Sequence, residues 1–307
     1  MIAQILLDVV LPIFVLIGLG ALMQRAFRLD LYTLAKINFY YITPAVVFLS
    51  MYEAEMSAEL LGNVTLFYVL YVILLYAVSA IVSRSRKFSP GMKAAFTNSL
   101  ILDNSGNYGL PINQLAFKGD PLASSLQALI MTFQSLVTFT YGVMSVQRAK
   151  SGGTLKAAFI GFLKMPVPYA LVLGLLFHFL RLPLPEFLSK PLGYVSDSMV
   201  SIALLTLGAQ IVKYPLRLDR ADVYISVVLR LLAGPAIGVL LVFLLGLKGI
   251  PAQALLIASG MPTGVNSTIL AEEYDNEPDF ASQTVLISTL LNIITITALI
   301  SLAKYVG

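Results

Sequence analysis

Two long apolar segments of this chain are each interrupted by a short polar stretch that contains glycine. The first segment, residues 91–118, places the polar run 103–107 between apolar runs at 92–102 and 108–117. The second, residues 251–272, has Gly-Met-Pro-Thr-Gly at 260–264, after which Asn266 and Ser267 open its second apolar run. In lipid each unpaired backbone group costs several kcal/mol, so an unwound backbone is tolerated only where it lines a protein-enclosed cavity. Two broken spans at matching positions of two halves predict a transporter's binding site.

The composition predicts an all-α, polytopic membrane protein. Of the 307 residues 58% are hydrophobic and only 12% are charged, against roughly 25% charged in a soluble domain. The absence of cysteine excludes thiolate chemistry, and the single histidine, His178, leaves little for metal binding or acid–base catalysis. We find no GxSxG, HExxH or P-loop pattern, so we expect no enzyme activity, no metal and no cofactor. A net charge of +4 in such a chain indicates cytoplasmic loops and not nucleic-acid binding.

Apolar windows of about 20 residues predict ten membrane spans. The first window lacks the basic segment of a signal peptide, so we expect a first transmembrane helix that starts outside. One set of alternate loops carries 14 of the 20 Lys and Arg residues and the other carries five, which predicts a cell-membrane protein with both termini extracytoplasmic. The windows are 5–23, 34–52, 62–83, 91–117 (broken), 122–146, 165–180, 187–212, 222–247, 251–271 (broken) and 280–303.

The chain also predicts an internal repeat. A Gly/Ser-rich linker at 150–154 separates five spans in residues 1–149 from five in residues 155–307, and the fourth span of each half is the broken one. Because five is odd, the second half starts on the opposite side of the membrane. The two repeats are therefore expected to be inverted, related by an axis in the membrane plane.

The residues at the two breaks resemble those of the auxin efflux carrier family. The motifs are Asn104-Ser-Gly-Asn-Tyr-Gly-Leu-Pro111 and Met261-Pro-Thr-Gly-Val-Asn-Ser-Thr-Ile-Leu-Ala-Glu-Glu-Tyr274, and the order of spans agrees over nearly the whole length. The resemblance implies ten helices in two inverted five-helix repeats, with helices 4 and 9 crossing at mid-membrane, as in the bile/arsenite/riboflavin transporter superfamily. It also implies a small carboxylate such as malonate or malate as substrate. The chain lacks the long cytoplasmic loop and the Asn-Pro-x-Thr-Tyr motif of plant exporters, which argues against auxin itself.

The breaks suit an anionic substrate, because the N-terminus of a half-helix carries about half a positive charge and unpaired amides. An alternative is that the polar side chains only cap half-helices. The C-terminal ends, near Asp103 and Gly260, are expected to present bare carbonyls that with Asp103 hold Na⁺ or a proton; a neutral or paired structural Asp103 is the alternative. The predicted substrate-binding residues are Asn104, Gly106, Asn107, Tyr108, Pro262, Thr263, Gly264, Asn266, Ser267 and Thr268.

Further polar or small residues lie inside other predicted spans. Asn38, Gln134 and Asn292 are predicted to line the cavity, or else to form helix–helix hydrogen bonds. Arg230 lies inside the eighth span, and we favour a side chain that snorkels to the cytoplasmic surface over one that attracts anions. Gly234 and Gly238, four residues apart, predict close helix packing.

These patterns together predict a secondary carrier of a small organic anion that works by alternating access. The alternatives are a sodium-coupled organic-acid symporter of the bile-acid type, or a membrane receptor that does not transport. The expected partners are the organic acid anion and the lipid bilayer, with coupling to H⁺ or Na⁺ and a homodimer left open.

Overall fold

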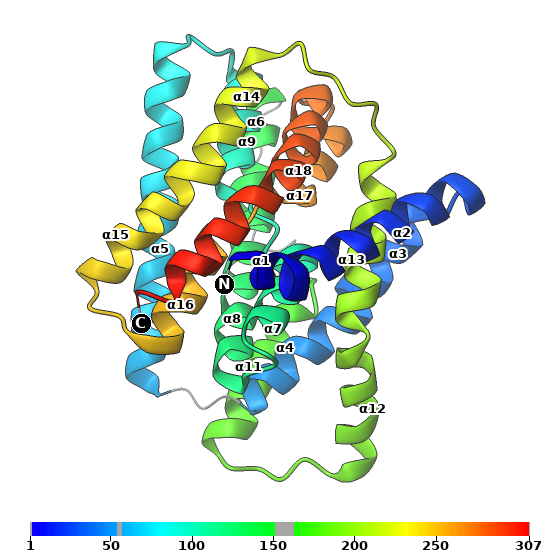
Figure 1. Cartoon of the computed structure of the whole chain (residues 1–307), viewed down its shortest axis with the longest axis vertical. Coiled ribbons are helices and arrows are strands. Elements are labelled where there is room, and N and C mark those ends of the chain that lie inside the picture. Colours follow the sequence, from blue (N-terminus) through cyan, green and yellow to red (C-terminus); the bar gives the residue numbers. More distant parts are fainter. Residues whose placement is uncertain (1, 54–56, 151–162, 307) are drawn as a thin grey trace. The chain divides into compact units, whose positions relative to one another are not determined.

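The computed structural model describes residues 2–53, 57–150 and 163–306, and within them the chain is helical with no β-strand (Figure 1). Residues 151–154 of the predicted linker lie outside the described part. The chain forms two compact units: unit 1 comprises Met1–Ala58, Ser105–Thr132 and Leu163–Lys213, and unit 2 comprises Glu59–Asn104, Phe133–Phe162 and Tyr214–Gly307. Each unit takes segments from both halves of the sequence. The boundary between Asn104 and Ser105 falls inside the first interruption.

Unit 1 is built around the crossing of two helices, α2 and α13, which contact each other extensively. A Cβ added at Gly20 of α2 would overlap the carbonyl of Leu205, and one added at Gly208 of α13 would overlap that of Ile17, so both glycines permit backbone contact. The elements assigned mainly to this unit are α1 (Ile2–Ile5), η1 (Leu6–Val10), α2 (Leu11–Phe27), α3 (Leu31–Ile37), η2 (Asn38–Ile42), α4 (Thr43–Tyr52), η3 (Ser105–Gly109), α7 (Leu110–Ala116), α8 (Pro121–Val137), α11 (Val167–Phe179), α12 (Glu186–Asp197) and α13 (Met199–Ile211), where η denotes a π-helical segment.

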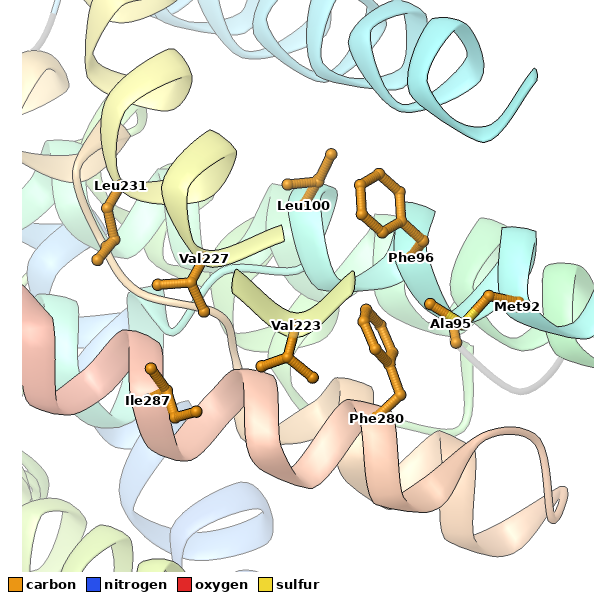
Figure 2. Packing of buried hydrophobic residues seen from close by; sticks show 9 residues of the cluster. All are labelled: Met92, Ala95, Phe96, Leu100, Val223, Val227, Leu231, Phe280 and Ile287. Carbon is orange, nitrogen blue, oxygen red and sulfur yellow. The ribbon is translucent and has the colours of Figure 1, made fainter. Parts of the chain in front are cut away.

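Unit 2 has an apolar core between α6, α14 and α18. Figure 2 shows the side chains that meet there: Met92, Ala95, Phe96, Leu100, Val223, Val227, Leu231, Phe280 and Ile287. Through Leu100 and Leu231, this core packs the C-terminal end of α6 against the π-helical segment at Leu229–Ala233. The elements of this unit are α5 (Ala58–Ser85), α6 (Pro90–Ile101), η4 (Thr138–Gly142), α9 (Val143–Lys150), α14 (Ala221–Val228), η5 (Leu229–Ala233), α15 (Gly234–Leu244), α16 (Gly249–Ser259), α17 (Val265–Glu273) and α18 (Pro278–Ala303).

The described residues contain seven helical stretches long and apolar enough to cross a membrane, and each overlaps a predicted window. The window at 165–180 corresponds to α11, a shorter apolar helix, and the two predicted broken windows hold α6, η3 and α7, and α16 and α17. Residues 102–104 and 260–264 are not helical. The long stretches are Ala3–Phe27, Leu31–Tyr52, Ala58–Ser85, Pro121–Ala149, Glu186–Ile211, Ala221–Leu244 and Pro278–Ala303.

Four of the π-helical segments described here end two residues before a proline, at Pro12, Pro44, Pro111 and Pro235. A proline lacks the N–H that would bond the carbonyl four residues earlier, and its ring clashes with that carbonyl, so a wider turn relieves the contact. This corrects one prediction. Residues 105–107, expected in a loop, belong to η3, because Pro111 widens the turn that precedes it and the backbone stays helical.

Candidate functional site

The two non-helical stretches contact each other within unit 2. The amide of Asn104 donates to the carbonyl of Pro262 at 2.9 Å, and the amide of Gly264 donates to the carbonyl of Leu102 at 2.7 Å. Asp103 and Thr263 therefore form an isolated antiparallel bridge. Such pairing satisfies backbone groups that an interrupted helix would leave open.

Gly264 permits this close contact. A Cβ at position 264 would lie 2.5 Å from the carbonyl oxygen of Asp103 and 3.0 Å from that of Leu102, both backbone atoms. Any side chain at this position would push the two stretches apart. The close contact alone explains the glycine at this position. Its φ of −75° lies in a region that any residue can adopt.

Thr263 ties the bridge to neighbouring helices. Its Oγ1 donates to the carbonyl of Ser99 at 2.9 Å, and its amide donates to Oγ of Ser288 in α18 at 3.2 Å. Ser99 in turn shares a 2.6 Å hydrogen bond with Ser226 of α14. Thr263, predicted to bind substrate, thus has its hydroxyl and its amide engaged in holding the interruption in place.

Arg230 of η5 is fully buried beside the bridge. Its Nε donates to the carbonyl of Met261 at 2.8 Å, its Nη1 to that of Leu100 at 2.8 Å, and its Nη2 to that of Ser259 at 3.3 Å. The same Nη2 lies 3.6 Å from the carboxylate of Asp103, whose side chain is 2% exposed. The expectation that Arg230 snorkels to the surface is wrong, because its donors face inward onto carbonyls that need partners.

The expectation of bare carbonyls at the C-terminal ends of α6 and α16 is also wrong. Besides the three bonds from Arg230, the carbonyl of Ser259 accepts from the hydroxyl of Tyr71 at 2.7 Å. The carbonyl of Gly260 accepts from Nδ2 of Asn292 at 2.8 Å, so this predicted cavity residue is bonded to the interruption itself. Gly234 and Gly238 let α15 reach this end of α16: a Cβ at Gly234 would lie 2.9 Å from the carbonyl oxygen of Ser259, which agrees with the predicted close packing.

The N-terminal end of α17 differs from these saturated C-terminal ends. Its N-cap residue, Gly264, offers no side-chain hydrogen bond, and Asn266 in its first turn is half-buried. Ser267 returns its hydroxyl to the carbonyl of Gly264 at 2.8 Å. Within the described residues, the buried Nδ2 of Asn104 and the buried Oγ1 of Thr268 have no hydrogen-bond partner. Uncapped amides and unsatisfied polar groups suit a polar, negatively charged ligand.

The other predicted residues of the first break belong to unit 1. Gly106 and Asn107 in η3 are half-buried, and a Cβ at Gly106 would lie 3.3 Å from the sulfur of Met131. Tyr108 is fully buried, with its ring edge-on to Phe14 at 6.3 Å between centroids. Its hydroxyl has no hydrogen-bond partner among the residues that the structure describes.

Asn38 and Gln134 make local contacts. Nδ2 of Asn38 donates to Oγ1 of Thr206 at 3.1 Å in unit 1, which is a helix–helix hydrogen bond. Nε2 of Gln134 donates to Thr138, one turn along the same helical stretch, at 2.9 Å. These two hydrogen bonds do not connect Asn38 or Gln134 to the Asp103–Thr263 bridge.

Sequence reasoning missed three contributors to the bridge: the inward orientation of Arg230, the hydroxyl of Tyr71 and that of Ser288. For Arg230 the signal was present, since an arginine inside an apolar span needs buried acceptors if it does not reach the surface. Tyr71 and Ser288 lie in otherwise ordinary apolar helices, and no local pattern distinguishes them from packing residues.

Comparison with known proteins places the chain among membrane transporters. The family described as "Membrane transport protein" matches residues 5–300. An "Uncharacterized transporter" of Methanothermobacter thermautotrophicus (strain Delta H) is 25% identical over 295 residues, covering 94% of this chain and 95% of that protein. A "Putative malonate transporter" of Rhizobium meliloti (strain 1021) is 26% identical over 314 residues, covering 96% and 95%. "Auxin efflux carrier component 8" of Arabidopsis thaliana is 25% identical over 164 residues, half of this chain and 45% of that protein.

Proposed function

This chain belongs to the membrane transport protein family, and from that premise we propose that it is a secondary carrier of a small organic anion across the cell membrane. The substrate carboxylate binds at the start of α17 and beside the amide of Asn104. The carrier works by alternating access, with no cofactor.

The observation that carries the proposal is the uncapped start of α17 next to a buried side-chain amide without a partner. Gly264 provides no cap, and Nδ2 of Asn104 has no acceptor in the described part of the chain. A carboxylate oxygen would accept a hydrogen bond from Nδ2 of Asn104, while the amide of Gly264 stays bonded to Leu102. The helix dipole would favour the carboxylate's charge by roughly 0.3–1 kcal/mol at an exposed end and up to ~2 kcal/mol when partly buried.

A small carboxylate is the substrate class that the similar proteins and the hydrogen-bond donors of the site favour. The printed name of the rhizobial relative refers to malonate, and that protein aligns with this chain over nearly its whole length. The polar groups at the start of α17 are neutral donors, and the nearest buried guanidinium, that of Arg230, is already bonded to three carbonyls. Malonate and similar short dicarboxylates are therefore the first substrates to test.

For the architecture we propose ten spans in two inverted repeats, residues 1–149 and 155–307, with the two interrupted segments crossing at mid-membrane and both termini outside. The contact between residues 102–104 and 260–264 in unit 2 supports a crossing. The sharing of both sequence halves between the two compact units supports a repeat whose halves intertwine. A homodimer remains compatible with this arrangement.

The test is binding and flux of radiolabelled malonate with the purified protein, in detergent and in proteoliposomes. Asn104→Asp keeps the side-chain shape but replaces the donor by a negative charge, so we expect affinity for malonate to fall at least about tenfold, or 1.4 kcal/mol. Asn63→Asp is the matched control, since Asn63 lies in the second turn of α5, away from the bridge.

Three results would direct the assignment elsewhere. Unchanged malonate affinity in Asn104→Asp would remove this side chain from the site. Uptake that requires sodium would favour the symporter of the bile-acid type. Binding without any flux in proteoliposomes would favour a receptor.

A further inference from the structure

The C-terminal ends of two half-helices meet at one side chain in unit 2. The carbonyl of Leu100 belongs to the last turn of α6. The carbonyl of Ser259 ends α16, and that of Met261 lies in the non-helical stretch that follows. Each helix C-terminus carries about half a negative charge, and the carboxylate of Asp103 adds a full one. Such converging carbonyls and helix C-termini are where secondary transporters coordinate a coupling cation.

We propose that the guanidinium of Arg230 is a tethered cation that takes the place of a coupling Na⁺ at this cluster, with Asp103 as its fixed counter-ion. Arg230 is thus a positioning residue that holds the two interruptions together, and the carrier binds its anion without sodium. The inference deepens the proposed function, because it concerns the coupling of the same site, but the cation measurements below do not require any substrate.

Hydrogen-bond geometry supports this assignment. A guanidinium has five N–H donors in a rigid planar fork and keeps its charge in proteins, so it can bond several carbonyls at once as a metal ion would. Arg230 makes three such bonds, two of them at 2.8 Å, and its charge lies over the ring of Tyr71 at 5.8 Å. Asp103, at 3.6 Å, balances the charge. Within the described residues no group of three or more acidic, histidine or cysteine side chains is arranged so that it could hold a metal ion.

The fold fixes both ends of the Arg230 side chain. Arg230 lies in η5, the π-helical segment that ends two residues before Pro235, and its neighbour Leu231 points into the apolar core with Leu100 (Figure 2). The core therefore fixes the start of the arginine side chain, and the carbonyls fix its end. Gly234 lets Ser259 approach, since a Cβ there would lie 2.9 Å from the carbonyl oxygen of Ser259 and 3.0 Å from the hydroxyl of Tyr71.

The first measurement uses the unchanged protein in detergent. We expect the same melting temperature in sodium chloride and in choline chloride at equal ionic strength, and malonate binding that does not depend on sodium. A saturable rise of the melting temperature with sodium in the unchanged protein would overturn the proposal. Absence of malonate binding would instead count against the proposed substrate and leave the cation result intact.

The second measurement removes the tethered cation. Arg230→Ala leaves Asp103 and the carbonyls facing a space, so the melting temperature should fall by at least about 5 °C. Millimolar guanidinium chloride or sodium chloride should then restore part of it in a saturable way, whereas choline chloride should not. Arg230→Lys should retain more stability than Arg230→Ala. The control is Arg217→Ala, because the side chain of Arg217 is 55% exposed and should show no cation response.

A double variant separates a cation site from ordinary packing. Arg230→Met with Asp103→Asn leaves no lone buried charge, so it should be obtainable even if Arg230→Ala does not fold. We expect it to melt below the unchanged protein and to have lost any response to sodium or guanidinium. A purified Arg230→Ala without a cation response, or a double variant as stable as the unchanged protein, would overturn the proposal.

Discussion

Replacing Gly264 by alanine tests whether the contact between the two interruptions determines the site. The added methyl group would lie 2.5 Å from the carbonyl oxygen and 2.8 Å from the carbonyl carbon of Asp103, closer than real Cβ atoms approach other heavy atoms. Because these neighbours are backbone atoms, no side-chain rotation relieves the overlap. The two stretches must separate by several tenths of an ångström or more.

Separation weakens the hydrogen bonds of the bridge, Asn104 to Pro262 at 2.9 Å and Gly264 to Leu102 at 2.7 Å. A buried donor that loses its partner costs about 1–3 kcal/mol, so the two together cost about 2–6 kcal/mol. The lower chain entropy of alanine in the unfolded state offsets only about 0.4–1 kcal/mol. The net loss is about 1–6 kcal/mol, so we expect the apparent melting temperature to fall by about 2–20 °C, since 1 kcal/mol corresponds to roughly 2–4 °C in a chain near this size.

The assay is thermal unfolding of purified protein in detergent, followed by malonate binding at a temperature where both variants are folded. Gly62→Ala in α5 is the matched control, because a Cβ there has nothing within 4 Å and alanine is a better helix former than glycine. If Gly264→Ala melts and binds like Gly62→Ala, the contact is not a constraint and the steric reasoning fails.

Three further outcomes follow from the structure and sequence. Gly208→Ala should lower the melting temperature, because its Cβ would overlap the carbonyl of Ile17, whereas Gly18→Ala on α2, with nothing within 4 Å, should not. Tyr71→Phe should cost about 1 kcal/mol by removing the bond to Ser259 while the unchanged ring stays beside Arg230, so thermal unfolding should show a small loss and flux should persist. A reporter fused after Gly307 should behave as extracytoplasmic and a cysteine at position 151 should label only from the cytoplasm; a cytoplasmic reporter signal would mean that the number of spans is wrong.

The positions where helix stops could be predicted from sequence, because they depend on residues a few positions apart. The predicted break at 103–107 overlaps the non-helical residues 102–104, and the predicted Gly/Pro break at 260–264 coincides with the non-helical residues 260–264. The extent of the first stretch was predicted too long, since Pro111 acts four residues upstream and turns residues 105–107 into a π-helical segment. The available signal was Pro111 itself, whose missing N–H leaves the carbonyl of Asn107, four residues earlier, without its usual helical partner.

The orientation of Arg230 could not be predicted in the same way. Its acceptors are separated from it by about 30 residues, at Ser259 and Met261, and by 130 residues, at Leu100. Hydropathy gives only the local cost of burying a charge, and snorkelling is the simplest local way to avoid it. The partners that make burial favourable exist only once the two interruptions are in contact.

The two kinds of helix end at the bridge have different chemical consequences for a carrier. The C-terminal ends are bonded by Arg230, Tyr71 and Asn292, groups that stay with the protein, so their negative dipoles are satisfied whether or not substrate is present. In the part of the chain that the structure describes, the N-cap of α17 makes no side-chain hydrogen bond, so its positive dipole would be available to an anion in the proposed carrier. Because Arg230 is already paired with Asp103, the anion would meet partial charges and not a full positive charge. Binding by dipoles and neutral amides is weaker than binding by a buried ion pair, and a carrier must release its substrate on the far side of the membrane. A fixed Arg230–Asp103 pair, neutral overall and close to a helix N-terminus without a side-chain cap, would therefore suit reversible binding of an anion better than a free buried arginine would.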